Sequence, residues 1–340
     1  MRAPRNFAQS ARLFRTARFI DNRAQMWYHS DDDMFSIALT NVLITLCYII
    51  PGFALCKLKK ACADHLSTLS AVLVYVCSPC MIASSMLEFP RSARAMADVA
   101  LFFAVFLLLQ LAFMLILFAL CRKRYGEAKY RIFTVASVMG NVGFFGLPII
   151  KALFPGNPEV MAYSCVASVA LNMLTFTAGV YCTTGDKSKV SITKGIFNPN
   201  TIGFIAGVIL SLSGAENFLP EPLISAVGLV GDMSTPVCML ILGIRLGAVS
   251  FSKLFTRPII YLTVAAKLLI FPLFCYAAVY FLPLSITFKA SVTVLASVPC
   301  ASMVLNIAEL YGGETELSAN CVLLSTLLCF ITIPLLTLLI

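Results

Sequence analysis

Residues 140–148 read Gly-Asn-Val-Gly-Phe-Phe-Gly-Leu-Pro, and this stretch lies inside an apolar run that covers 130–153. Its glycines and proline would be costly in a continuous helix, because glycine loses the most backbone entropy on folding and proline removes a hydrogen-bond donor. The sequence therefore predicts an interrupted helix within a segment long enough to cross a membrane.

The whole chain has the composition of a membrane protein. Of its 340 residues, 60% are hydrophobic and 12% are charged. A soluble domain has about 25% charged residues, because it must cover its surface with groups that interact with water. These values exclude a soluble domain and indicate that lipid surrounds most of the chain.

Apolar runs of membrane-spanning length follow one another along the chain. A helix rising about 1.5 Å per residue needs about 20 residues to cross a hydrocarbon core of about 30 Å. Transmembrane strands are excluded, because the runs are too long and lack polar/apolar alternation. We expect an all-α membrane protein of about ten transmembrane helices, at 35–56, 66–87, 98–121, 130–153, 160–182, 199–214, 222–247, 257–281, 287–310 and 316–338.

The distribution of basic residues predicts the orientation. Loops that follow odd-numbered spans hold most of the Lys and Arg residues, and cytoplasmic loops are enriched in them. The even set holds only Arg91, Arg94, Lys151 and Lys289. We therefore expect a multi-pass protein of the cell membrane, with both ends of the ten-helix body on the non-cytoplasmic side.

The first 33 residues conflict with this topology, because their arginines would have to be translocated. Three explanations stay open: a translation start at Met34, an organellar presequence, and a real tail that is an exception. We leave 1–33 outside the fold. The positive charge of the chain is attributed to loop topology, and no nucleic-acid partner is expected.

The second half of the body resembles the first. Ser78-Pro79 in the second span corresponds to Thr235-Pro236 in the seventh, and Ala136-Ser137-Val138 in the fourth corresponds to Ala296-Ser297-Val298 in the ninth. Five spans per half is an odd number, so the halves would be inverted relative to each other, as in many secondary transporters. The predicted domains are repeats 34–182 and 199–340, joined by a cytoplasmic loop, 183–198.

The ninth span contains an interruption that matches the fourth, around Pro299. Irregular backbone at membrane depth is tolerated only where protein or a water-filled cavity satisfies it, and the N-terminal end of a half-helix attracts anions. Ordinary proline kinks with small residues for close packing are the alternative. The predicted substrate-binding residues are Gly140, Asn141, Gly143, Pro148, Ser297, Pro299, Ser302 and Asn306.

The motif of residues 140–148 resembles the signature of the auxin efflux carrier family, in its short-loop bacterial form, over about 34–340. Asn141, Gly146 and Pro148 match the family pattern directly, whereas the residues around Pro299 are less distinctive. The resemblance implies that helices 4 and 9 cross, that a scaffold bundle faces a mobile one, and that the substrate is a carboxylate. Malate- or malonate-like acids and indole acetate are examples.

Two ionisable residues lie near the middle of predicted spans, Asp232 in the seventh and Lys267 in the eighth. A charge at the bilayer centre costs about 2.5–3.5 kcal/mol on insertion scales, so neither should face lipid. Their similar depths in adjacent helices predict a pair. Either the pair is a static neutralising contact, or Asp232 couples transport to a gradient of protons or another cation, by exchanging a proton or by trading Lys267 for a substrate carboxylate.

The predicted function is secondary active transport of a small organic anion. A sodium- or proton-coupled symporter or antiporter of related fold is the alternative within transport. We expect no enzyme, because an intramembrane enzyme needs a catalytic dyad or a metal cluster within its spans, and His29 and His65 lie outside them. No cofactor or metal is expected, and a homodimer is a candidate assembly.

Overall fold

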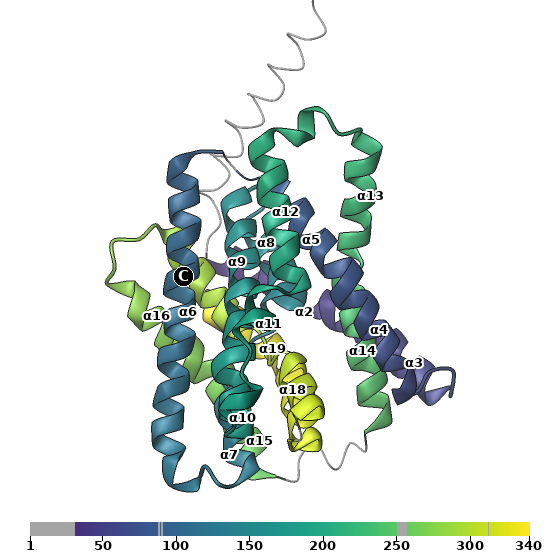
Figure 1. The fold of residues 1–340 in the computed structure, drawn as a ribbon, viewed down its shortest axis with the longest axis vertical. Helices are drawn as coiled ribbons and strands as arrows, with labels where there is room; N and C mark the ends of the chain where they lie inside the picture. The colour runs from purple at the N-terminus through teal and green to yellow at the C-terminus, as the bar shows by residue number, and fades with distance from the viewer. Residues whose placement is uncertain (1–30, 88, 90, 250–256, 312) are drawn as a thin grey trace, which may run out of the picture.

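The computed structural model describes residues 31–87, 89, 91–249, 257–311 and 313–340 (Figure 1). Within these ranges the chain is helical, and the single β-type contact is an isolated antiparallel bridge between Gly140 and Cys300. Most of the predicted tail, 1–30, lies outside the described residues, and the first described helix begins at Asp31.

Many predicted spans consist of consecutive helical pieces. In the first half the α-helices are α2 (Asp31–Cys47), α3 (Ile49–Lys57), α4 (Leu66–Val72), α5 (Ser78–Leu87), α6 (Ala93–Cys121), α7 (Ala128–Ala136), α8 (Leu147–Leu153), α9 (Pro158–Leu174), α10 (Val180–Thr184) and α11 (Ile192–Ile196). In the second half they are α12 (Pro199–Ser213), α13 (Glu221–Asp232), α14 (Ser234–Ala248), α15 (Pro258–Ala265), α16 (Phe271–Tyr280), α17 (Ile286–Ser297), α18 (Met303–Tyr311) and α19 (Thr315–Thr337). Single π-helical turns, Leu73–Cys77, Val142–Gly146, Thr175–Gly179 and Ala266–Ile270, join some of these pieces.

Seven continuous helices in the described part of the chain are long and apolar enough to cross a membrane, and each coincides with a predicted span. The other three predicted spans contain the shorter apolar helices Val142–Leu153, Pro199–Ser213 and Ile286–Ser297. The all-helical class is therefore confirmed for the described residues, with seven helices of spanning length, whereas the count of ten transmembrane helices stays a prediction.

The helices pack in two groups. The first bundle contains α3, α5, α12, α13 and α14, with the closest packing between α3 and α14 and between α5 and α12. The second bundle contains α6 to α10 and α15 to α19, in which α6 packs on α9 and α16 on α17. Helix α2 packs against α19 and α8 of the second bundle. In Figure 1, α13 and α14 lie on the right and α6 and α16 on the left.

Close approach of backbones explains how the first bundle packs. A Cβ atom on Gly243 of α14 would lie 2.1 Å from the carbonyl oxygen of Ile49, and one on Gly52 of α3 would lie 2.2 Å from that of Leu240. Only glycine fits at such a crossing, which is the usual way for membrane helices to gain van der Waals contact.

Aromatic side chains fill the core of the second bundle. The rings of Phe102 and Tyr163 are stacked with centroids 4.4 Å apart, and Phe288 packs against both. This cluster joins α6, α9 and α17 into one body, because aromatic pairs add stacking attraction to their large buried area.

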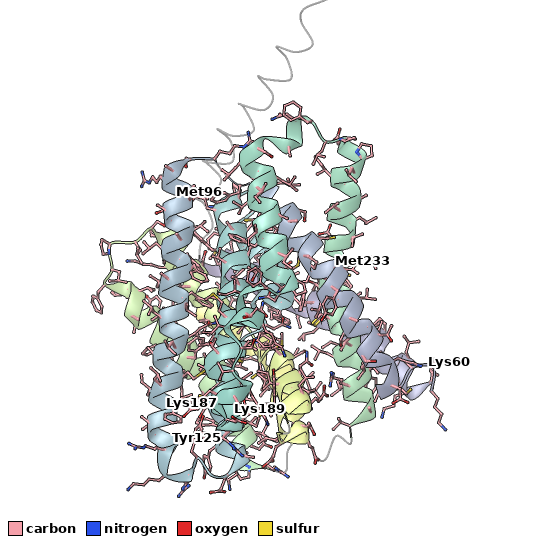
Figure 2. All side chains as sticks on the ribbon, in the orientation of Figure 1. Lys60, Met96, Tyr125, Lys187, Lys189 and Met233 are labelled. Carbon is pink, nitrogen blue, oxygen red and sulfur yellow. The ribbon has the colours of Figure 1, made fainter. Side chains whose placement is uncertain are left out.

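Loop lysines gather toward one end of the molecule. Lys60, Lys187 and Lys189 lie in the lower part of Figure 2, whereas Met96 lies in the upper part. These lysines belong to loops predicted to be cytoplasmic. The orientation in the membrane itself stays a prediction.

Candidate functional site

The first interruption lies between α7 and the π-helical turn Val142–Gly146 that leads into α8. Pro148 has no N–H and cannot donate to the carbonyl oxygen of Phe144, four residues earlier. The hydroxyl of Thr235, on α14 of the first bundle, donates to this oxygen at 2.8 Å. A side chain from the opposite bundle thus satisfies a carbonyl group that the proline leaves free.

The second interruption separates α17 from α18. Val298 adopts an extended conformation, as the residue before a proline usually does. Its neighbours pair with the first interruption: the amide of Asn141 donates to the carbonyl oxygen of Pro299 at 2.8 Å, and that of Ala301 donates to Met139 at 3.0 Å. We call residues 139–141 and 299–301, with these two hydrogen bonds, the backbone bridge.

Lys267 lies beside the backbone bridge and is fully buried. Its Nζ donates to the carbonyl oxygen of Ala296 at 2.8 Å and lies 4.7 Å from the ring centroid of Phe271. A Cβ atom on Gly140 would be 2.9 Å from this Nζ, so a larger residue there would displace the lysine side chain. The ammonium group therefore lies at the C-terminal end of α17, where the helix dipole favours a positive charge.

A small cavity of about 80 Å³ adjoins the backbone bridge. It is lined by Asn141 and Gly143 from the first interruption and by Ser302 and Asn306 from the second. The hydroxyl of Ser302 is buried and has no hydrogen-bond partner in the described structure. Two helix starts, the unpartnered hydroxyl and four amide side chains, since Asn172 and Asn200 also line the cavity, form a polar site suited to an anion.

The other predicted binding residues lie elsewhere. Gly140 and Pro299 are part of the backbone bridge, and Ser297 is buried and donates to the carbonyl oxygen of Val294. Pro148 lines a different cavity. The structure thus brings four of the eight residues to the small cavity, and the binding role of all eight stays a prediction.

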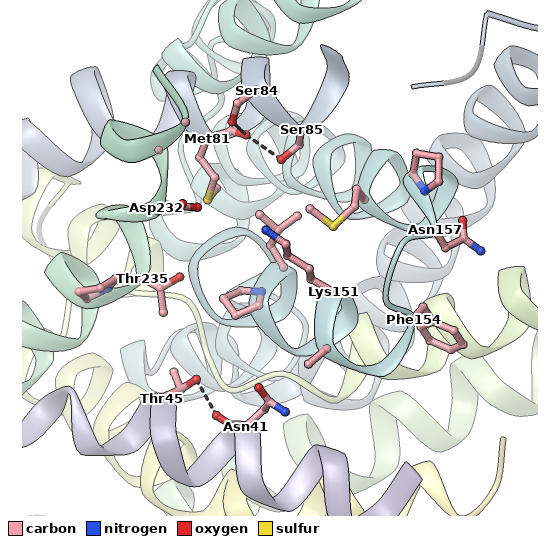
Figure 3. Close-up of a pocket in the computed structure, with 18 of the residues that line it drawn as sticks. Asn41, Thr45, Met81, Ser84, Ser85, Lys151, Phe154, Asn157, Asp232 and Thr235 are labelled. Atoms are coloured by element: carbon pink, nitrogen blue, oxygen red, sulfur yellow. Dashed lines mark hydrogen bonds between the residues drawn. The ribbon is translucent and has the colours of Figure 1, made fainter. Parts of the chain in front are cut away.

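A large cavity of about 620 Å³ lies further along the helix Val142–Leu153, beyond the small cavity (Figure 3). It begins at Leu147 and Pro148, about one helical turn beyond Phe144 of the small cavity. Lys151 and Asp232 extend into it from α8 and α13, on its two walls. Its other polar lining comes from Asn41, Thr45, Ser84, Ser85, Asn157 and Thr235.

The expected pairing of Asp232 with Lys267 is not present. Lys267 is buried beside the backbone bridge, whereas Asp232 is an exposed residue of the large cavity, and no ion pair joins them in the described structure. Similar depth in adjacent helices did not bring the two side chains together, because they belong to different bundles. Asp232 lines the large cavity, and its separation from lipid stays a prediction.

Sequence reasoning missed two charged residues of the cavities, Arg245 in the small one and Lys151 in the large one. Both were counted as loop charges, yet both lie within predicted spans, 222–247 and 130–153. A basic residue inside an apolar run costs free energy unless it faces water or protein, and that cost was the available signal.

Helices of spanning length, paired interruptions and polar cavities are typical of multi-pass helical membrane proteins of the transporter class. A family model described as membrane transport protein matches the chain twice, over residues 37–192 and 183–337. The chain belongs to this family, which confirms the resemblance to auxin efflux carriers.

Two archaeal proteins are similar over nearly their whole length. An uncharacterized transporter of Methanothermobacter thermautotrophicus is 25% identical over 307 residues, which cover 89% of this chain and 98% of the relative. An uncharacterized transporter of Methanocaldococcus jannaschii is 21% identical over 306 residues, which cover 88% and 97%. Both names agree with the family and indicate no substrate.

Proposed function

We propose that this protein is a secondary active transporter of the cell membrane that carries a small organic anion, a carboxylate, through the small cavity. Its body would contain ten transmembrane helices in two inverted repeats, with the fourth and ninth spans (130–153 and 287–310) crossing at the backbone bridge. Membership of a membrane transport family supports the general class.

One observation supports this function above all others: two interrupted helices, one from each half of the chain, are hydrogen-bonded at their interruptions and share a polar cavity. In secondary transporters, substrate sites lie where discontinuous helices of two repeats meet, because the half-helix ends supply charge and free hydrogen-bonding groups. The starts of the turn Val142–Gly146 and of α18 would face the carboxylate.

The two cavities support alternating access. The large cavity is wide and contains Lys151, and the small cavity lies about one turn away along the same helix. The first bundle supplies one wall and the second bundle another in both cases. In this proposal the second bundle moves against the first, so that the substrate reaches one side of the membrane through the large cavity and the other side through the small one.

Coupling to a proton or cation is a second element of the proposal. Asp232 is an exposed carboxylate in the large cavity, where it can exchange protons or cations with solvent. Asp232 therefore favours one alternative function, that of a sodium- or proton-coupled symporter or antiporter of related fold.

Counterflow in proteoliposomes tests the proposed function. The full chain is reconstituted with unlabelled acid inside, and uptake of labelled malonate, malate or benzoate is measured. We expect saturable counterflow of at least one acid. Absence of counterflow for all three, with protein shown to be folded and inserted, would contradict the proposal.

A matched pair of variants locates the site. Asn141→Asp places a negative charge in the small cavity, and like charges in contact cost several kcal/mol, so we expect counterflow to fall at least about tenfold. Ser92→Asp is the control, because Ser92 caps α6, lines neither cavity, and aspartate caps a helix equally well. Equal effects of the two variants would argue against binding at Asn141.

A further inference from the structure

Arg245 is the one charged side chain among the described residues that line the small cavity. It lies on α14 of the first bundle, within the last turn, and its side chain is only 15% exposed. A guanidinium group is always charged at neutral pH, so its burial beside a cavity needs a compensating anion. The small cavity therefore contains a fixed positive charge.

The compensation of the charge of Arg245 is incomplete in this structure. An Nη atom of Arg245 lies 3.3 Å from a carboxylate oxygen of Glu309, on α18 of the second bundle. The Nε atom of the same guanidinium is buried and has no hydrogen-bond partner among the described residues. A carboxylate that binds arginine well accepts from two N–H groups at once, and the contact with Glu309 leaves the buried Nε–H unused.

The geometry fits a second carboxylate. The guanidinium fork matches a carboxylate in shape and charge, and the buried hydroxyl of Ser302 in the same cavity also has no partner. Glu309 is half-exposed, at 48%, so it can turn toward water when another anion takes its place. An incoming acid could accept hydrogen bonds from both of these donors, the Nε–H of Arg245 and the hydroxyl of Ser302.

We propose that Arg245 binds the carboxylate of the substrate, and that Glu309 forms an ion pair with the guanidinium group when no substrate is bound. This assignment rests on the proposed function and adds a residue and an exchange of partners to it. Because Glu309 and Arg245 belong to different bundles, substrate binding would also release one connection between them.

Substitutions test the exchange with malonate, or whichever of the three acids gives counterflow, as the probe. Arg245→Gln removes a charged hydrogen-bonding partner, so KM should rise about tenfold or more. Glu309→Gln removes the competitor, so KM should fall about two- to fivefold, the range of a partly exposed ion pair. The double variant should resemble Arg245→Gln, and Arg245→Lys should be intermediate because lysine keeps the charge and loses the fork.

Arg257 and Glu314 supply the matched control. They form an ion pair between the start of α15 and the residue before α19, and neither lines the small cavity. Arg257→Gln and Glu314→Gln should leave KM within about twofold of the wild type, as expected for a surface pair.

The outcomes are distinguishable. An unchanged KM in Arg245→Gln, or a KM raised by Glu309→Gln, would overturn the assignment while counterflow by the wild type still supports the carrier. Absence of counterflow by the wild type would overturn both. If Arg245→Gln does not fold, Arg245→Lys and Glu309→Gln decide. Wild-type KM values in both would overturn the assignment. A KM lowered by Glu309→Gln would support it, because a damaged fold cannot improve affinity.

Discussion

Single residues maintain the interruptions by supplying partners that the helices themselves cannot. Thr235 donates to the carbonyl oxygen that Pro148 leaves free, and Lys267 donates to the last turn of α17. Backbone groups buried without partners cost free energy comparable to a lost hydrogen bond. An irregular segment at this depth is therefore stable only with such side chains around it.

Thr235→Val tests the hydroxyl that replaces the missing donor. Valine has nearly the same shape, so the main effect is an unpartnered carbonyl group at Phe144, and we expect the free energy of unfolding to fall by about 1–3 kcal/mol. Thermal unfolding of the purified protein in detergent measures it. Thr183→Val is the control, because Thr183 is also buried but donates within its own helix to Gly179. Equal losses in the two variants would contradict the special role of Thr235.

At the scale of elements, the sequence predicted the interruptions well because glycine and proline act on the local backbone. It also placed most spans, since an apolar run of about 20 residues has few alternatives to a membrane helix. The pairing of Asp232 with Lys267 was wrong because sequence gives depth along a helix, whereas each residue turns the side chain by about 100° around the axis. The same limit applies to Arg245: its place inside an apolar run signals that it faces water or protein, and the packing of α14 shows that it faces a cavity.

Packing of α3 on α14 depends on glycine at the crossing. In Gly243→Val the new side chain would meet the carbonyl oxygen of Ile49, so the helices must separate, and we expect a lower melting temperature and reduced folded yield. Gly228→Ala in α13 is the control, because a Cβ atom there meets nothing within 4 Å. Alanine has the higher helix propensity, so this control should be neutral or slightly stabilising. A stable Gly243→Val protein would show that the crossing has more space than the structure describes.

At the scale of the whole molecule, two bundles surround cavities that differ in size and in charge. The large cavity contains both a cation and a carboxylate, whereas the small one contains Arg245 alone among charged groups of its described lining. In the proposed mechanism, this asymmetry would give the two access routes different electrostatic environments. A defined orientation in the membrane is therefore part of the proposed mechanism.

Labelling of Cys62 tests that orientation. Cys62 is exposed in the loop after the first predicted span, which the distribution of basic residues places in the cytoplasm. A membrane-impermeant maleimide should label it in inside-out vesicles and not in right-side-out vesicles. Cys62→Ser is the control that identifies the labelled site among the other cysteines. Labelling from the outside would reverse the predicted topology.

The backbone bridge has a consequence for how far such proteins can diverge. Its hydrogen bonds join main-chain atoms, so most amino-acid replacements leave the donors and acceptors in place. Substitution of most side chains near the interruptions would therefore leave the hydrogen bonds between the two halves in place. Proline at 141 or 301 is the replacement that would delete a donor outright.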